Sequence, residues 1–186
     1  RDVVGSDGTD RLDHVQKVGF SDTELTVTSA GQFGEVTVDA FSPGYSTTPT
    51  VAMLAGGGHV IVWEAGNQAY MQRYDAFGAQ IGSKTQIGVY AYDSDVAALD
   101  NGGYVVAYYG YESDGSNSYA IRAKVYDAGG SLTASYVLSN PADGGWDPAI
   151  TALEGGGFAV SWSRYSGGYD VYAALVSANG TVTPAF

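Results

Sequence analysis

One block of residues occurs three times in this chain, each time with the same order of features. An apolar run ends at a leucine, a glycine pair or triplet follows, and a second apolar run ends at an aromatic residue nine positions after the leucine. These leucines and aromatic residues are Leu54 and Trp63, Leu99 and Tyr108, and Leu153 and Trp162. A fixed unit with variable spacers is typical of a supersecondary unit that stacks on its neighbours to bury its apolar faces. We therefore expect the three aromatic residues to belong to the core.

Each copy of the block predicts four short strands. In the first copy they fall at 50–54, 59–64, 69–75 and 80–89, with turns at 56–58 and 75–78. Asp or Asn followed by Gly in the last turn of each copy supplies the positive φ angles that tight hairpins require. Glycine interrupts every window in which a helical period of 3.6 residues could develop, so the sequence predicts no helix.

Four antiparallel strands per repeat are typical of a β-propeller blade, so the predicted fold class is all-β with a β-propeller-like array of four-stranded antiparallel blades. The expected repeats are 49–92, 93–145 and 146–186, and a partial blade at 24–45 brings the count to about three and a half repeats. A β-sandwich is the alternative, because its strands have the same pattern. Ring closure stays open: a small closed ring, a piece of a larger ring, or a half-ring that closes as a homodimer.

The chain carries a formal net charge of −12, from 20 acidic and 8 basic residues. A phosphate backbone repels a chain of this charge, so nucleic acid is excluded as a favoured partner. Divalent cations are the natural counter-ions, and Ca²⁺ prefers the oxygen ligands that are plentiful here. Solubility alone is the other reading of the charge. No organic cofactor is expected, because the glycine clusters connect strand to strand and not strand to helix.

The 186 residues contain no cysteine. This count excludes disulfides, thiolate catalysis and thiolate zinc sites. It fits a bacterial secreted protein that folds with calcium in place of cross-links, and it does not exclude a cytoplasmic one. No apolar stretch has the length of a membrane span, so we expect no membrane insertion. Because the sequence begins at Arg1, we read it as part of a longer secreted protein, with 1–23 as an N-terminal extension to a repeat domain at 24–186.

The N-terminal segment Gly5–Asp13 resembles the calcium-binding nonapeptide of RTX proteins, with Ser6 in place of one glycine. The following segment Leu12–Asp22 resembles the end of an RTX β-roll. The resemblance implies secretion and a calcium-dependent neighbouring region, with Asp7 and Asp10 as metal ligands. A β-roll takes the ligands of each calcium ion from two successive repeats, and only one is present here. A solvated loop is therefore the alternative for this segment.

The larger repeat resembles tandem units of very large secreted bacterial adhesin-like proteins, which often stand next to RTX repeats. The residues that carry the resemblance are Val51–Trp63 with Tyr74–Ala76, and Val96–Tyr108 with Tyr126–Ala128. The third copy departs from it, with Val176–Ala178 where Tyr-Asp-Ala would stand. The resemblance implies an extracellular location and a repeat fold more than it implies an activity.

Aromatic residues in the spacers and at strand ends, with carboxylates such as Asp93 and Asp147 nearby, are the best functional lead. An aromatic face stacks on the apolar face of a sugar ring, while carboxylates and amides accept its hydroxyl protons. The predicted ligand-binding residues are Tyr109, Tyr111, Glu112, Asp114, Asn117, Tyr119, Trp146, Tyr165, Tyr169 and Asp170. The alternative is that these tyrosines pack between blades with their hydroxyl groups at the rim.

The stretch Glu112–Asn117 places acid, hydroxyl and amide oxygens around a glycine. Asp114 is therefore also a candidate calcium ligand, although the spacing differs from that of an EF-hand loop and an ordinary Asp-Gly turn explains it equally. No catalytic constellation accompanies it. The two histidines, His14 and His59, stand without a Gly-x-Ser-x-Gly elbow, and no spacing pairs two carboxylates for glycoside hydrolysis.

These observations lead to three hypotheses of function. The first is a secreted, non-catalytic binding module for carbohydrate or a cell-surface polymer within a larger RTX-type protein. The second is a structural spacer or self-association repeat of an adhesin. The third is a non-catalytic part of a polysaccharide-degrading enzyme. The first is favoured because the spacers that differ most between copies carry the aromatic residues.

Overall fold

The structure is a computed structural model, and it describes residues 17–19, 24–26, 37–39, 46–111 and 118–185. The chain divides into two compact units, Arg1–Val38 and Asp39–Phe186. In the first unit, strand β1 (Lys17–Gly19) pairs antiparallel with β2 (Glu24–Thr26). Of the partial blade expected at 24–45, the structure describes only residues 24–26 and 37–39, and Thr37 and Val38 are not in a strand.

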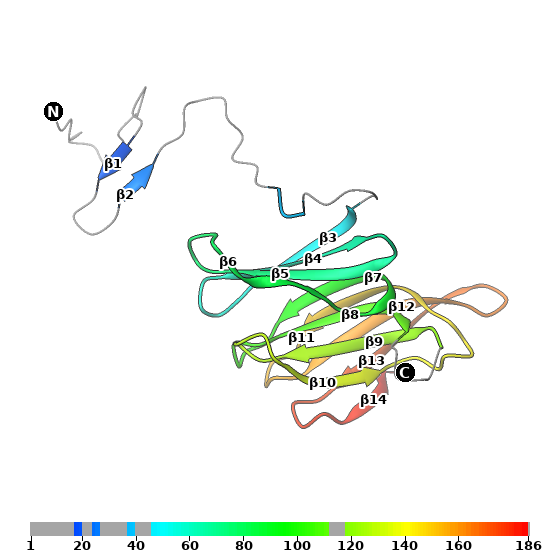
Figure 1. The fold of residues 1–186 in the computed structure, drawn as a ribbon. Coiled ribbons are helices and arrows are strands. Elements are labelled where there is room, and N and C mark those ends of the chain that lie inside the picture. Colours follow the sequence, from blue (N-terminus) through cyan, green and yellow to red (C-terminus); the bar gives the residue numbers. More distant parts are fainter. Residues whose placement is uncertain (1–16, 20–23, 27–36, 40–45, 112–117, 186) are drawn as a thin grey trace, which may run out of the picture. The chain divides into compact units, whose positions relative to one another are not determined.

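Three four-stranded antiparallel sheets make up the second unit (Figure 1). In each sheet the strands follow one another in chain order, so neighbours in sequence are neighbours in space. The first sheet contains β3 (Ser46–Met53), β4 (His59–Ala65), β5 (Gln68–Tyr74) and β6 (Gln80–Gln86). The second contains β7 (Val89–Ala98), β8 (Tyr104–Tyr111), β9 (Ala120–Tyr126) and β10 (Leu132–Val137). The third contains β11 (Trp146–Ala152), β12 (Phe158–Tyr165), β13 (Tyr169–Val176) and β14 (Val182–Ala185).

The all-β prediction is confirmed, and the described residues contain no helix. Each copy of the repeated block forms one sheet, as the sequence predicted. The described residues do not form a closed ring of sheets. They also contain no helix that could span a membrane.

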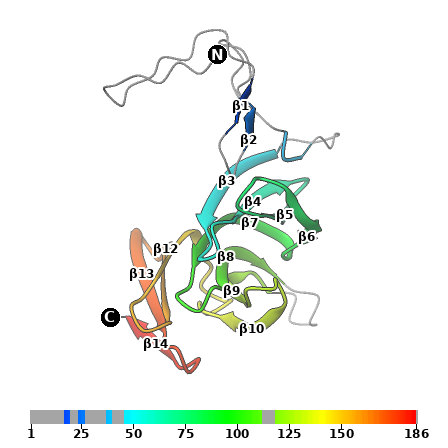
Figure 2. The same ribbon diagram turned by 90° about the vertical axis from the view of Figure 1, so that its left-hand side faces the viewer.

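The second sheet lies between the other two (Figure 2), and an apolar cluster fills each of the two interfaces. Val60 and Val62 of β4 meet Tyr104, Val106 and Tyr108 of β8 in the first cluster. On the opposite face of β8, Val105 and Ala107 meet Phe158, Val160 and Trp162 of β12 in the second cluster. Strand β8 is therefore apolar on both faces, which explains its nearly unbroken run of apolar residues.

The aromatic residues that end the repeated block are buried, as predicted. Trp63, Tyr108 and Trp162 are 3%, 0% and 6% exposed. The glycine before each second strand has a steric reason. A Cβ atom on Gly58 would lie 2.3 Å from the carbonyl oxygen of Tyr74, and the corresponding contacts at Gly103 and Gly157 are 2.3 Å and 2.4 Å. Only glycine permits this close approach of two backbone segments in all three copies.

Candidate functional site

Three connections lie at the same end of their sheets: β4–β5, β8–β9 and β12–β13. They do so because consecutive strands run antiparallel. The first strand of each sheet also starts at this end, and we call it the spacer end. The glycine turns and the turns between third and fourth strands lie at the opposite end. Most of the aromatic side chains singled out in the sequence belong to strand termini at the spacer end.

Six aromatic rings of the second and third sheets form a connected cluster at the spacer end. Tyr109 is its centre, with ring centroids 5.2 Å from Tyr119 and 6.3 Å from Trp146. Tyr111 links this centre to Tyr90, at 5.3 Å from Tyr119 and 5.2 Å from Tyr90. The cluster thus comprises Tyr90, Tyr109, Tyr111, Tyr119 and Trp146, together with Tyr92, whose side chain is hydrogen-bonded to Tyr119. Ring contacts of this kind fix the orientation of each aromatic face.

An open cavity of about 340 Å³ adjoins this cluster. Its lining combines two aromatic side chains, two carboxylates and one hydroxyl group: Trp146, Tyr169, Asp93, Asp147 and Ser163. Trp146 is 39% exposed and Tyr169 is 80% exposed, so both rings present surface to solvent. Tyr165 stands beside Tyr169, with ring centroids 5.3 Å apart. A cavity with exposed aromatic faces and a few convergent polar groups is suited to an amphipathic ligand such as a sugar.

Polar contacts of two carboxylates connect the three sheets next to the cavity. The Glu64 carboxylate accepts hydrogen bonds from the Thr48 hydroxyl group at 2.6 Å and from the backbone N–H of Asp93 at 2.5 Å. The backbone N–H of Asp147 in turn faces the Asp93 carboxylate and lowers its pKa. Glu64 thereby ties β4 to β3 and β7, and Asp93 ties β7 to β11. A carboxylate that accepts a hydrogen bond from a backbone N–H forms a strong, charge-assisted bond. The contacts of Glu64 and Asp93 therefore fix the wall of the cavity.

The backbone supports the same arrangement in every sheet. Thr48, Asp93 and Asp147 have left-handed φ angles of 50°, 52° and 52°, and each stands six residues before a repeat leucine. The register of the strand pairing shifts at each of these positions. Non-glycine residues rarely adopt this conformation, and such residues gather at functional sites. A bulge at this position re-aims the first strand of each sheet toward its neighbour.

The base of the β8–β9 connection is held by a buried cation. Arg122 is 3% exposed, and its guanidinium group donates to the carbonyl oxygens of Gly110 at 3.1 Å and Ser118 at 3.3 Å. These carbonyls lie on the two sides of the connection, so one planar side chain with several donors bridges them. Arg122 therefore positions Tyr111 and Tyr119, which directly follow Gly110 and Ser118 in the sequence.

Burial and neighbouring groups raise the pKa values of Tyr109 and Asp93 at the site. Burial raises the pKa of Tyr109, and the nearby Tyr119 and Asp93 raise it further. Tyr109 is therefore a neutral hydrogen-bond donor at pH 7. Burial also raises the pKa of Asp93, and the charges of Glu64 and Asp147 add to this shift, while the N–H of Asp147 opposes it. Like charges close together disfavour ionisation, and carboxylates at the cavity attract a positively charged ligand and repel an anionic one.

The structure brings together most of the predicted binding residues that it describes. Tyr109, Tyr111, Tyr119 and Trp146 belong to the cluster, while Tyr169 lines the cavity and Tyr165 contacts the Tyr169 ring. Asp170 is exposed, and its neighbour across the strand pair is Arg164, so it does not line the cavity. Glu112, Asp114 and Asn117 lie outside the described residues. The sequence did not indicate that Glu64 joins Asp93 and Asp147. The equal offset of Asp93 and Asp147 from the repeat leucines was the signal for that pair.

Metal binding stays a prediction. Among the described residues, no group of three or more His, Asp, Glu or Cys side chains is arranged to hold a metal ion. The predicted ligands Asp7, Asp10 and Asp114 lie outside those residues. Neither the known protein-family models nor the curated protein sequences contain a match to this chain. The resemblances to RTX proteins and to adhesin-like repeats thus rest on the motifs alone.

Proposed function

We propose that this protein is a non-catalytic binding module for carbohydrate, and that the ligand binds at the cavity of the spacer end. The observation that carries the proposal is the meeting of the exposed rings of Trp146 and Tyr169 with Asp93 and Asp147 around one open cavity. Aromatic faces stack on the C–H face of a sugar ring. The carboxylates accept hydrogen bonds from the sugar hydroxyl groups, and the Ser163 hydroxyl group can donate or accept one.

The charge of the cavity narrows the class of glycan. Asp93 and Asp147 line the cavity, and the Glu64 carboxylate accepts a hydrogen bond from the backbone N–H of Asp93. A uronic acid or sulfated sugar would bring further negative charge against these groups, in a protein whose net charge is already −12. Neutral sugars and sugars with a free amino group are therefore the proposed ligands. An extracellular location and a role within a larger bacterial protein are part of the proposal, supported by the acidic, cysteine-free composition.

We also propose that the three sheets are consecutive blades of a propeller-like array. In support, their first strands β3, β7 and β11 are neighbours, and each sheet packs face to face on the next. The same first strands carry Thr48, Asp93 and Asp147, and Glu64 of β4 accepts hydrogen bonds from Thr48 and Asp93. In such an array the ligand cavity lies where adjacent blades meet, which is a frequent location for binding sites between repeated units.

The test is binding of the full chain to an array of neutral, amino-sugar and anionic glycans, followed by calorimetry with the best binder. Trp146→Ala and Tyr169→Ala each remove an exposed ring, so the fold should persist. We expect each to weaken binding at least about tenfold, the equivalent of about 1.4 kcal/mol. Phe77→Ala is the matched control, because Phe77 is 92% exposed and stands in the β5–β6 turn at the opposite end.

Three results would contradict the proposal. Binding that is equal in the wild type and in both cavity variants would place the ligand elsewhere on the protein. Preference for anionic glycans would refute the charge argument. Release of reducing sugar from a bound glycan by the isolated chain would show that the protein is an enzyme.

A further inference from the structure

Each sheet has two faces, and their roles repeat along the chain. We call the face that packs on the preceding sheet the front face and the face that packs on the following sheet the back face. The front face of β8 presents Tyr104, Val106 and Tyr108 to the first sheet. The front face of β12 presents Phe158, Val160 and Trp162 to the second sheet. Both front faces carry large side chains, which are at most 6% exposed.

The back faces that meet them carry smaller side chains. Strand β4 presents Val60 and Val62 to the second sheet, and β8 presents Val105 and Ala107 to the third. All four are fully buried. Each internal interface therefore places a row with aromatic ends against a row of small aliphatic side chains. Large rows packed against small rows fill the space between sheets without overlap.

The first sheet has a front face that neither the second nor the third sheet covers. In the repeat, His59, Ile61 and Trp63 correspond to Tyr104, Val106 and Tyr108. Val51 and Met53 on β3 correspond to Val96 and Ala98, which pack against the first sheet. Val51 is 63% exposed and Met53 is 67% exposed, whereas Val96 is 7% exposed. This end of the front face is thus an apolar surface of the kind that is buried in the next sheet.

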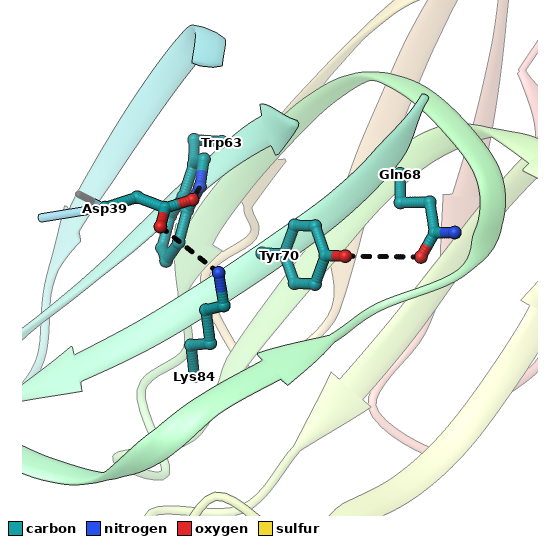
Figure 3. A network of polar contacts seen from close by, with 5 residues as sticks. All are labelled: Asp39, Trp63, Gln68, Tyr70 and Lys84. Carbon is teal, nitrogen blue, oxygen red and sulfur yellow. Dashed lines mark hydrogen bonds and ion pairs between the residues drawn. The ribbon is translucent and has the colours of Figure 1, made fainter. Parts of the chain in front are cut away.

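The other end of this front face is occupied by polar contacts from the chain itself (Figure 3). The Trp63 indole N–H donates to the Asp39 carboxylate at 2.9 Å, and Lys84 forms an ion pair with the same carboxylate at 3.1 Å. The Lys84 ammonium group also lies 4.8 Å from the centre of the Tyr70 ring. These contacts lie toward the β4–β5 turn and leave Val51 and Met53, beside the β3–β4 turn, accessible.

The third sheet has the complementary surface. Its back face carries Ala159 and Ser161 on β12 and Val171, Ala173 and Leu175 on β13, as the strand pairing shows. Val171 is 81% exposed and Leu175 is 38% exposed. The row is uncharged and composed mainly of small side chains. It therefore has the character of the back-face rows that receive Tyr104–Tyr108 and Phe158–Trp162 inside the chain.

We propose that a second copy of this chain covers these surfaces, by packing the back face of its third sheet on the front face of the first sheet. The argument comes from the internal interfaces, because the chain twice packs a front face on a back face. It also leaves Val51 and Met53 of one front face and Val171 of one back face mostly exposed. Two front faces would bring large side chains such as Met53 and Ile61 against one another, and two back faces would leave a gap between small ones. The contact is therefore head to tail, with unlike faces in contact.

The experiment is the solution mass of the full chain by light scattering, from micromolar to near-millimolar concentration. Met53→Lys places a charge on the front face, and Val171→Lys places one on the back face. Because both side chains are mostly exposed, the variants should fold, which the circular dichroism melting curve verifies. We expect the wild-type mass to rise with concentration and each variant alone to stay monomeric. Phe77→Lys, at an exposed turn outside both faces, should associate like the wild type.

Mixing the two variants is the decisive step. Met53→Lys retains an intact back face and Val171→Lys retains an intact front face, so an equimolar mixture should form dimers of one chain of each kind and nothing larger. A wild type that is monomeric at every concentration would overturn the proposal, as would association that neither variant weakens. If Met53→Lys dissociates the assembly while Val171→Lys does not, like faces meet and the head-to-tail arrangement is wrong.

Discussion

The packing of the second sheet between the other two makes a sharp prediction about adjacent residues of one strand. Val105 and Val106 of β8 point to opposite faces, and both are 0% exposed. In a sheet with one solvated face, one of two adjacent residues would tolerate truncation. Here, Val105→Ala and Val106→Ala should destabilise the protein by similar amounts, because each deletes two methyl groups from a closed apolar cluster.

The magnitude follows from the burial. Loss of two methyl groups costs about 1.6 kcal/mol in transfer free energy, at about 0.8 kcal/mol per group. An unrelaxed cavity of about 50 Å³ adds about 1.2 kcal/mol, so each variant should lose about 1.6–2.8 kcal/mol. Val51→Ala is the control, because Val51 is 63% exposed and only about a third of its transfer term is at stake, about 0.6 kcal/mol.

Urea unfolding at low protein concentration measures these losses, provided that the slope of the free energy against urea is the same in all variants. A cost for Val105→Ala no larger than that for Val51→Ala would show that the third sheet does not cover the second. The same result for Val106→Ala would show that the first sheet does not cover the second. Either outcome would refute the stacked arrangement from which the cavity and the docking faces are derived.

Two further predictions concern the site wall and the turns. Because burial and neighbouring acids raise the pKa of Asp93 above its ordinary value of 3.8, the folded protein binds this proton more tightly than the unfolded chain does. The stability that protonation provides is therefore lost as the pH rises through the raised pKa. Asn at position 93 keeps a hydrogen-bond acceptor and tolerates a left-handed φ. Asp93→Asn should therefore have a higher melting temperature than the wild type at pH 7, and the difference should shrink toward pH 4. A difference in melting temperature that stays constant with pH would contradict this prediction. Gly58→Ala should lower the free energy of unfolding by about 1–3 kcal/mol, because its Cβ atom would lie 2.3 Å from the Tyr74 carbonyl oxygen. Gly56→Ala in the same turn is the control, because its Cβ atom would meet nothing within 4 Å. Equal unfolding midpoints for the two variants would show that the turn adapts.

Local patterns in the sequence determined the strands, the turns and the buried aromatic residues. Alternation and glycine spacing depend only on neighbouring residues, so the repeat predicted three four-stranded antiparallel sheets and the burial of Trp63, Tyr108 and Trp162. Most of the spacer tyrosines could also be singled out, because strand ends at one edge are implied by the strand order. The close approach at Gly58 was visible only as a glycine that recurs in each copy.

The tertiary structure decided which faces are covered and which polar groups meet. Val105 and Val51 have the same apolar character in the sequence, yet one is fully buried and the other is mostly exposed, because burial depends on whether another sheet packs there. Glu64, Asp93 and Asp147 belong to three different strands, and only the stacking of the sheets brings them within hydrogen-bond distance. Contacts between residues far apart in the chain have no local signature, so neither the cavity nor the two docking faces could be located from the sequence alone.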